Sequence, residues 1–157
     1  MKTDKTGVLS TAAAKTLTLY RRTELESADA DYIVPIPMHR LRRWERGVNS
    51  PDLLAEELGR QLKISVVRHF VWRIRQTDLQ YTLSHRGRTE NVAGAFALRS
   101  TRFWFAGPPL SGKNVLLVDD ILTTGSTCNE VAKILLAAGV KTVTVAALAR
   151  AAGANQW

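Results

Sequence analysis

The sequence has 157 residues, of which 45% are hydrophobic and 23% are charged, as in one globular domain long enough to bury a core. No apolar run reaches the length of a membrane span, residues 1–30 lack the apolar core of a signal peptide, and the single cysteine excludes an internal disulfide or a cysteine-built metal site. We therefore expect a cytoplasmic chain without membrane insertion. Its net charge of +8 favours a polyanionic partner, either a nucleic acid or a multiply phosphorylated metabolite.

The predicted organisation is an N-terminal arm (residues 1–30), one domain (residues 31–150) and a short tail (residues 151–157). Within the arm, Ala12–Tyr20 favours a short helix, but the stretch is rich in threonine and its apolar face is thin. A frayed arm and a docked helix therefore remain equal alternatives.

The domain is predicted to open with a short buried strand at Tyr32–Val34, which two prolines end in an extended segment. A helix is expected from Pro51 to about Leu62. Its start combines a serine N-cap, a proline at the first helical position and an acid in the first turn, Ser50–Asp52. A short strand is expected next, at Ile64–Val67.

The middle of the sequence shows no sustained hydrophobic period. Residues 80–96 are polar and basic and contain glycine, so we expect a loop with a marginal helix near Ser84–Val92. Phe103–Phe105 is a strand candidate, and Gly107–Pro109 is a predicted turn.

Val115–Val118 are consecutive aliphatic residues, a pattern typical of a strand that is buried on both faces of a parallel sheet. Two acids, Asp119 and Asp120, follow at its carboxyl end. Small hydroxylated residues and one glycine come next, at Thr123–Thr127. This order of strand, acids and glycine-hydroxyl loop predicts a ligand crevice in an open α/β sheet.

The remaining pattern completes the fold prediction. Cys128–Ala138 has the spacing of an amphipathic helix, and Gly139 stands where a glycine commonly ends one. Thr142–Leu148 suits a neighbouring parallel strand. Alternating strands and helices argue for an α/β domain with a mostly parallel sheet flanked by helices.

The two halves of the crevice suit different parts of a ligand. Backbone N–H groups and hydroxyls of Thr123–Thr127 at a helix start suit a phosphate. Asp119 and Asp120 would repel that phosphate, but they suit a vicinal diol or a bound divalent cation a short distance away. A sugar phosphate with magnesium meets both demands. The alternative is that the acids cap an exposed strand end and that Ser126 or Thr127 is a helix N-cap.

A second motif, Gly107–Asn114, nearly matches the nucleotide-binding P-loop. We reject an ATPase because Asn114 stands where a magnesium-binding hydroxyl is needed. In addition, the segment leads into a predicted strand, whereas a P-loop opens a helix. Its prolines suit a surface turn better than a phosphate cradle.

The stretch VLLVDDILTTGST (Val115–Thr127) resembles the phosphoribosyl-pyrophosphate (PRPP) signature of the type I phosphoribosyltransferases. The resemblance implies a type I phosphoribosyltransferase-like fold. It also implies that Asp119 and Asp120 contact the ribose hydroxyls and that the following loop holds the 5-phosphate. The implied phosphate-binding residues are Thr123, Thr124, Gly125, Ser126 and Thr127.

Flanking segments narrow the resemblance. Val34–Arg40, Arg46–Asn49 and residues 80–96, with the signature, resemble the ComF family of competence-protein-F, amidophosphoribosyltransferase-like proteins linked to bacterial DNA uptake. Many relatives carry an N-terminal cysteine-rich zinc-binding segment, which this sequence lacks, so we expect a short or truncated form. Purine-salvage relatives place an acid at the position of Thr123, as a base toward the purine, so hypoxanthine or guanine salvage is disfavoured.

The resemblance implies magnesium-dependent displacement of pyrophosphate at C1 of the ribose, with an acceptor that the sequence leaves open. Mg²⁺ would be held mainly by PRPP, near the acid pair, and not directly by protein ligands. The expected diphosphate contacts are Met38, His39 and Arg40 after the first strand, and Arg86 and Arg88 as catalytic candidates in a mobile lid, Ser84–Phe96. Ordinary solvated turns are the alternative at both places.

The second hypothesis is a non-catalytic module that binds single-stranded DNA or a protein partner on the same fold. Arginines interleave with aromatic residues at Arg42–Arg46, Val71–Arg75 and Arg102–Trp104, which can pair phosphate contacts with base stacking. The alternative for each tryptophan is core packing. The predicted partners are PRPP or a related sugar phosphate, with single-stranded DNA and the DNA-uptake machinery as further candidates, and an oligomer is compatible with the sequence.

Overall fold

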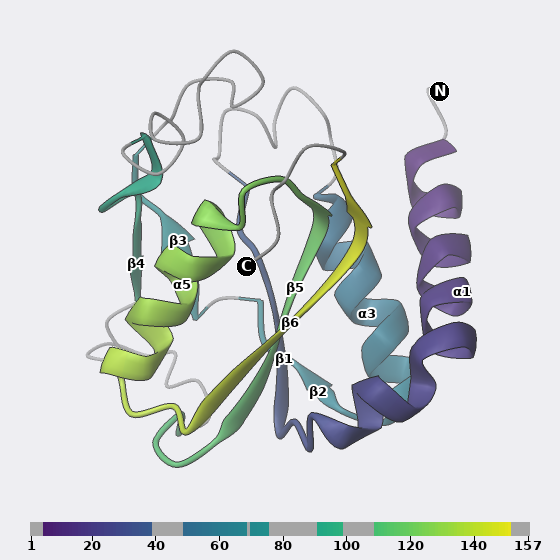
Figure 1. The fold of residues 1–157 in the computed structure, drawn as a ribbon, viewed down its shortest axis with the longest axis horizontal. Helices are drawn as coiled ribbons and strands as arrows, with labels where there is room; N and C mark the ends of the chain where they lie inside the picture. Colours follow the sequence, from purple (N-terminus) through teal and green to yellow (C-terminus); the bar gives the residue numbers. More distant parts are fainter. Residues whose placement is uncertain (1–4, 39–48, 69, 76–90, 99–108, 152–157) are drawn as a thin grey trace.

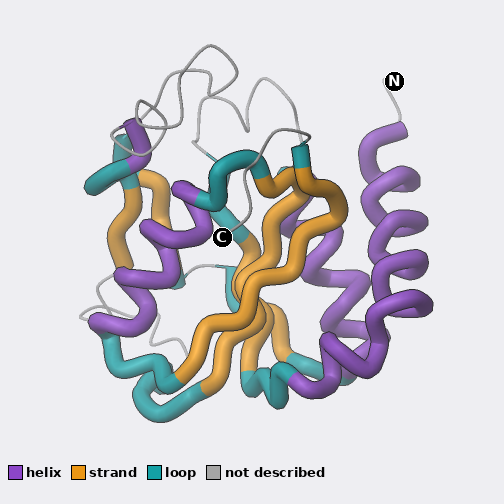
Figure 2. Tube along the Cα trace, in the orientation of Figure 1, coloured by secondary structure: helices purple, strands orange, loops and turns teal. Residues whose placement is uncertain are grey.

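The computed structural model describes residues 5–38, 49–68, 70–75, 91–98 and 109–151. In this part of the chain, a four-stranded parallel sheet lies between two helices on one face and a helix with a small antiparallel sheet on the other (Figures 1 and 2). The elements are α1 (Lys5–Ser27), β1 (Tyr32–Pro35), α3 (Ser50–Leu62), β2 (Ser65–Val66), β3 (Val71–Arg73), β4 (Phe96–Leu98), β5 (Asn114–Leu122), α5 (Ser126–Ala137) and β6 (Thr142–Arg150). The predicted parallel sheet flanked by helices is confirmed.

The main sheet has the strand order β2-β1-β5-β6, and every neighbouring pair is parallel. Tyr32 of β1 lies opposite Val115 of β5, and Asn114 of β5 lies opposite Thr142 of β6. Because all four strands run in one direction, their carboxyl ends meet at one edge of the sheet. The two central strands, β1 and β5, each lead from this edge toward a helix.

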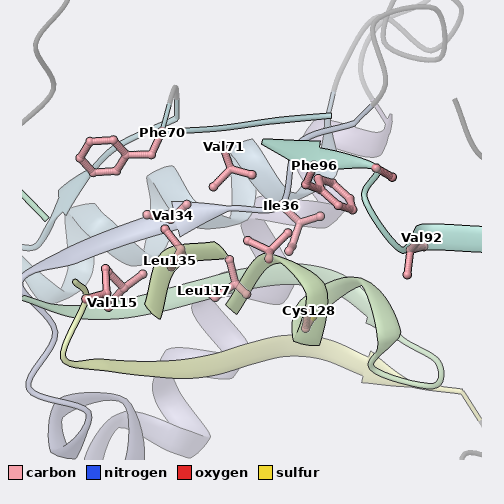
Figure 3. Packing of buried hydrophobic residues seen from close by; sticks show 13 residues of the cluster. Val34, Ile36, Phe70, Val71, Val92, Phe96, Val115, Leu117, Cys128 and Leu135 are labelled. Carbon is pink, nitrogen blue, oxygen red and sulfur yellow. The ribbon is translucent and has the colours of Figure 1, made fainter. Parts of the chain in front are cut away.

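Successive residues of the central strands pack on opposite faces of the sheet. Ile33 and Leu116 belong to the core cluster formed with α1 and α3. Val34 and Leu117 belong to the cluster formed with α5 and the antiparallel strands, which Figure 3 shows from close by. Apolar residues on both faces explain why β5 is a continuous aliphatic run and does not alternate with polar residues.

The N-terminal segment forms a long helix, α1, that is docked on the domain. Ala14, Thr18 and Leu25 are buried, and α1 packs mainly against α3 on the outer side of the sheet (Figure 1). The buried Thr18 hydroxyl donates to the carbonyl of Ala14, at 3.0 Å, so its polar group is satisfied within the helix. Of the two alternatives that the sequence left open, the structure shows the docked helix. The predicted boundaries at residues 30 and 150 stay predictions.

Helix α3 begins one residue earlier than predicted. Its N-cap is Asn49 and Ser50 is the first helical residue, so the expected serine cap is wrong. Leu54 and Leu58 are buried on its inner face. Gly59 allows a close approach to β2, because a Cβ there would lie 2.5 Å from Cγ2 of Val66 and 2.8 Å from the carbonyl oxygen of Ile64.

Residues 70–75 and 91–98, which we call the hood, contain the antiparallel strands β3 and β4. The sequence did not predict β4, which is only three residues long. Val92 and Phe96 are buried in the core beside α5, and the Arg75 guanidinium donates to the carbonyls of Asn91, at 3.0 Å, and Ala93, at 2.8 Å. Of the predicted lid, Ser84–Phe96, only residues 91–96 lie in the described part of the chain, where they belong to the packed hood; the lid stays a prediction.

Helix α5 ends where its sequence predicts. Gly139 has φ of 92° and donates its N–H to the carbonyl of Leu136, at 3.0 Å, while Val140 donates to Leu135, at 3.2 Å. These two bonds form the Schellman motif, in which glycine accepts the left-handed conformation without strain. The chain then enters β6, which extends two residues beyond the predicted strand, to Arg150.

Candidate functional site

The candidate site lies at the carboxyl edge of the sheet, where β5 gives way to α5. The sequence predicted that Asp119 and Asp120 follow the strand. Strand β5 runs to Leu122, so both acids lie within it. Pairing with β6 continues past both acids, since Ile121 lies opposite Ala149. The acids are therefore held by a hydrogen-bonded strand.

The loop after β5 turns sharply into α5. Gly125 is the N-cap, with φ of 74°, a left-handed conformation that favours glycine. Helix α5 then starts at Ser126, two residues before the predicted Cys128, so the alternative of a Ser126 or Thr127 N-cap is wrong as well. The buried hydroxyls of Thr124 and Ser126 lie 2.7 Å apart and form a hydrogen bond.

The first turn of α5 provides an electropositive helix end. It contains no acidic residue, its N-cap is a glycine, and the N–H of Ser126 donates to the Oγ1 of Thr124, at 3.4 Å. The N–H groups of a helix N-terminus carry partial positive charge and lack partners within the helix. The 12-residue helix therefore directs an anion-attracting end toward the same edge as the two acids.

Asp119 is fixed by two hydrogen bonds. Its Oδ1 accepts the N–H of Asp120, at 2.9 Å, and its Oδ2 accepts the thiol of Cys128, at 3.6 Å between sulfur and oxygen. Burial, followed by the negative charge of Asp120, raises the pKa of Asp119 to about 7. Burial and Asp119 also raise the pKa of the Cys128 thiol, so the thiol stays protonated and can donate.

A small cavity joins the acid to the loop. Its volume is about 30 Å³, so most of a ligand as large as a sugar phosphate would lie outside it. The lining residues are Asp119, Ile121, Leu122, Thr123, Gly125, Thr127 and Cys128.

The predicted site residues divide into three groups. Asp119, Thr123, Gly125 and Thr127 line one cavity. Asp120, Thr124 and Ser126 are neighbours of that cavity and do not line it: Asp120 accepts the N–H of Ile121, at 2.8 Å, and the two hydroxyls bond to each other. Met38 is half-buried beyond β1, while His39, Arg40, Arg86 and Arg88 lie outside the described residues.

Sequence reasoning missed the role of Cys128 beside Asp119. Cys128 is buried, in the core cluster shown in Figure 3. The available signal was its position in the first turn after the loop, close to the end of the preceding strand.

Of the three arginine–aromatic segments, only Val71–Arg75 lies in the described part of the chain. Trp72 is half-buried in β3, and the Arg73 guanidinium lies 5.4 Å from the centre of the Phe96 ring. Arg75 binds the carbonyls of the hood. The two arginines of this segment therefore contact other residues of the hood, while Trp72 belongs to neither buried core cluster, so both alternatives for it stay open.

The phosphoribosyl transferase domain matches residues 53–156, about two thirds of the sequence. The chain belongs to the phosphoribosyl transferase domain family. The matched range starts within α3 and contains β5, the loop and α5.

The resemblance to the ComF family is confirmed by similar proteins. Competence protein F of Haemophilus influenzae is 40% identical over 119 residues, which cover 76% of this chain and 50% of that protein. The DNA utilization protein YhgH of Escherichia coli K12 is 39% identical over 120 residues, covering 76% and 49%. Competence protein ComFC of Bacillus subtilis is 33% identical over 107 residues, covering 68% and 39%. The chain spans about half the length of these two curated relatives.

Solved structures agree on the fold. Adenine phosphoribosyltransferase from Saccharomyces cerevisiae superimposes with a TM-score of 0.55 at 14% identity, covering 90% of this chain and 68% of that one. A hypoxanthine-guanine phosphoribosyltransferase from Bacillus anthracis gives 0.53 at 16%, covering 96% and 74%. The predicted type I phosphoribosyltransferase-like fold is confirmed. At these identities the similarity concerns the fold alone.

Two observations bear on metals and membranes. In the residues that the structure describes, no three or more His, Cys, Asp or Glu side chains gather as metal ligands. None of the described helices combines the length and the apolar character needed to cross a membrane.

Proposed function

We propose that this chain binds PRPP with Mg²⁺ at Asp119–Thr127 and displaces pyrophosphate from C1 of the ribose. The observation that carries the proposal is that Asp119 lines the same cavity as Thr123, Gly125 and Thr127. An acid and a helix N-terminus at one cavity suit a ligand that has hydroxyls at one end and phosphate at the other.

The phosphate half of the proposal rests on α5. Its first turn has no acid to repel an anion, and Gly125 lets the backbone approach a phosphate without a side chain in the way. Thr123 and Thr127 line the cavity from both sides of Gly125. The 5-phosphate of a ribose would therefore be held by backbone N–H groups and hydroxyls.

The diol half of the proposal rests on Asp119. Hydrogen bonds from the Asp120 N–H and the Cys128 thiol orient its carboxylate before any ligand arrives. A carboxylate held in this way can accept hydrogen bonds from two adjacent ribose hydroxyls. Because its pKa is raised to about 7, ribose hydroxyls and a nearby cation would favour the charged form and release a proton on binding near neutral pH.

The described residues fit a magnesium ion that is bound mainly through the ligand. Mg²⁺ commonly keeps several waters and uses one or two carboxylates with substrate phosphates, and Asp119 and Asp120 supply carboxylates beside the cavity. When bound, the ion would neutralise charge on the departing pyrophosphate. The protein residues themselves would hold the ribose, orient its diol and fix the 5-phosphate.

In the proposed reaction, the bond between C1 and the pyrophosphate oxygen breaks and a bond from C1 to an acceptor forms. Pyrophosphate departs with the bonding electron pair, and the ribose passes through a transition state with oxocarbenium character. Asp119 would stabilise the positive charge that develops on the sugar through its contacts to the diol. The acceptor is not assigned, and Thr123 cannot serve as the acid–base group toward a purine.

The names of the relatives suggest a cellular setting. They are named for competence and DNA utilization, and we extend this to the chain as a proposal: its sugar-phosphate chemistry serves DNA uptake or the use of imported DNA. Direct binding of single-stranded DNA stays a prediction. A salt-dependent change in tryptophan fluorescence on titration with single-stranded DNA would support it, and no change at low salt would contradict it.

The decisive experiment measures pyrophosphate release from PRPP and Mg²⁺ by the purified chain, with a panel of amines and bases as acceptors. Calorimetry of PRPP binding runs in parallel. We expect magnesium-dependent binding and release of pyrophosphate with one class of acceptor. Binding without release for any acceptor would leave a PRPP-binding module and contradict the catalytic step. Absence of binding would contradict the whole proposal.

A further inference from the structure

Strand β6 is the outermost strand of the main sheet, and its outer edge pairs with no other strand in the described part of the chain (Figure 1). It is nine residues long, and its register with β5 keeps the same offset at both ends, so no bulge interrupts it. Thr142–Ala149 contains neither a charged residue nor a proline. Charges, prolines and bulges normally protect an edge strand from pairing with another chain. The outer edge of β6 is therefore open to the addition of a strand.

An apolar groove of about 310 Å³ lies beside this edge, between α5 and β6. Asn129 and Ala132 line it from α5, and Val143 and Val145 line it from β6. Val145 is 40% exposed, and Leu136, which lies one turn after Ala132 on the same side of α5, is 48% exposed. Apolar surface that stays exposed beside a hydrogen-bonding edge is typical of a site for another protein chain.

Two lysines lie next to residues that line the groove. Lys133 is on α5 and Lys141 directly precedes β6, and both side chains are exposed. Neither forms an ion pair with an acid in the part of the chain that the structure describes. Glu130, the acid of α5, instead accepts the N–H of Gly94 in the hood, at 2.7 Å. A docked segment that carries acids would therefore be attracted to the rim of the groove.

The same charges disfavour a second copy of the chain as the occupant of the groove. A copy would bring its own two lysines to the interface, and each copy carries a net charge of +8. Like charges that are brought together at an interface are unfavourable. Charge complementarity therefore favours a different protein, whose docking segment is negatively charged.

We propose that β6 and the groove beside it bind an extended, acidic segment of a partner protein. The segment adds a strand to the outer edge of the sheet, and its backbone pairs with the outward N–H and C=O groups of β6. Because side chains of a strand alternate between its two faces, every second residue of the segment enters the groove. Its acids meet Lys133 and Lys141. This inference goes beyond the proposed function, and its test uses no sugar phosphate.

The test selects binders of the full chain, at low salt, from random phage-displayed peptides of about twelve residues, long enough to pair along β6. Enriched peptides are synthesised, and their affinity is measured by fluorescence anisotropy. We expect them to alternate apolar with polar residues and to carry acids. Their binding should weaken as salt is added, because salt screens exposed charges. Amides of β6 should exchange hydrogen more slowly in the complex, because they become hydrogen-bonded.

The main variant is Val145→Glu, which places a negative charge and a longer side chain in the groove. We expect it to weaken binding of the enriched peptides at least about tenfold. Lys133→Glu should weaken their binding about fivefold, because it reverses one exposed charge pair. Leu19→Glu is the matched control, since Leu19 is a large hydrophobic residue of α1 that is 76% exposed, and it should bind like the wild type.

Thermal unfolding confirms that each variant is folded. If Val145→Glu does not fold, Ala132→Glu decides the same outcomes from the α5 side of the groove. Absence of enriched peptides would overturn the inference, as would peptides that bind folded Val145→Glu as tightly as the wild type. Selection of basic peptides, or slower exchange only outside β6, would overturn it as well.

Other occupants of the groove give different results. Sedimentation that shows a wild-type dimer, which dissociates in Val145→Glu, would mean that a second copy fills the groove. Peptides that are enriched with Trp157→Ala but not with the wild type would mean that the last residues of this chain fill it. Either result would overturn the proposal of an acidic partner segment.

Discussion

Helices α3 and α5 begin at the same edge of the sheet, each after one of its two central strands. At the start of α3, Pro51 has no N–H, Asp52 adds a negative charge and the Asp52 N–H is bonded to the carbonyl of Asn49, at 3.0 Å. The start of α5 has a glycine N-cap and no acid in its first turn. Position in the fold is therefore not enough to make an anion site: the first turn of α3 carries an acid and lacks the N–H of Pro51, whereas the first turn of α5 carries no acid and suits an anion better.

The two helix starts also differ in what their side chains bind. At the start of α3, the Asn49 amide donates to the Ile36 carbonyl and so connects the helix to the end of β1. The Cys128 thiol in the first turn of α5 is committed to Asp119, a residue that lines the cavity. Changes at α5 should therefore alter ligand binding, whereas changes in the body of α3 should alter stability.

The largest expected effect is loss of binding in Asp119→Asn/Asp120→Asn. Hydrogen bonds to charged groups contribute about 1.5–3 kcal/mol each, so removal of both charges should weaken PRPP binding about 100-fold or more. Calorimetry with Mg²⁺ measures this. The matched control is Glu24→Gln/Glu26→Gln on the exposed surface of α1, which removes the same charge. Equal affinity of the wild type and the aspartate variant would refute the site.

Gly59→Ala should test α3 as a purely structural element. The added methyl group would collide with the Ile64 carbonyl oxygen and with Val66, so we expect a loss of about 1–3 kcal/mol in the free energy of unfolding. Urea titration measures the loss. The folded fraction should bind PRPP with unchanged affinity. A large change in affinity would contradict the expectation that changes in the body of α3 alter stability and not ligand binding.

The pH dependence of stability should reveal the raised pKa of Asp119. Its pKa is about 7 in the folded chain and near 3.9 when unfolded, so the folded state binds the extra proton between these values. The contribution of Asp119 is thus fully present below about pH 4 and is lost as the pH rises through 7, by at most about 1.4 kcal/mol per pH unit. Asp119→Asn lacks this dependence. Its melting temperature relative to the wild type should rise from pH 4 to pH 8, and a constant difference would contradict the assignment.

Gly125→Ala should have a smaller effect on stability and a clear one on binding. Alanine at φ of 74° is strained by about 1 kcal/mol, and relaxing that strain would move the loop. We expect weaker binding of inorganic phosphate and of PRPP. Gly94→Ala is the matched control, because Gly94 also has a positive φ of 64° and open space around its Cα. Equal losses of affinity in both variants would argue against a phosphate loop.

The smallest expected effect comes from Cys128. Its thiol is a weak donor, so Cys128→Ala should weaken PRPP binding by less than about 1 kcal/mol, and Cys128→Ser, which keeps a donor, should lie nearer the wild type. Competition binding resolves such differences. A serine variant weaker than the alanine variant would contradict the role of the thiol as a donor to Asp119.

Local patterns in the sequence predicted much of the site. The aliphatic run Val115–Val118, the acids after it and the glycine of the loop are adjacent in the chain, so their order predicts a strand, a turn and a helix start. The end of α5 at Gly139 was predicted correctly for the same reason: a helix stop depends on one residue and its near neighbours. Boundaries were less accurate, because pairing with β6 extends β5 through Asp119 and Asp120.

Features that depend on distant residues were not predictable in this way. Strand β4 is too short to have a pattern of its own and exists because Phe96 pairs with Arg73. Docking of α1 depends on the surface of α3, which its own threonine-rich sequence does not indicate. The N-cap of α3 is Asn49 and not Ser50, and its side chain binds Ile36, thirteen positions away.

By itself, the sequence determined the order of the elements, the apolar faces of the central strands and the residue types at the phosphate loop, because these depend on local periodicity and on the conformations that glycine and proline allow. Only the tertiary structure decided which of the two acids lines the cavity at the loop and how the chain that leaves β1 is held beside it. That choice depends on hydrogen bonds between separate segments, from Cys128 to Asp119, from Asn49 to Ile36 and from Ile36 to Val118. Such bonds form only after packing brings their partners together.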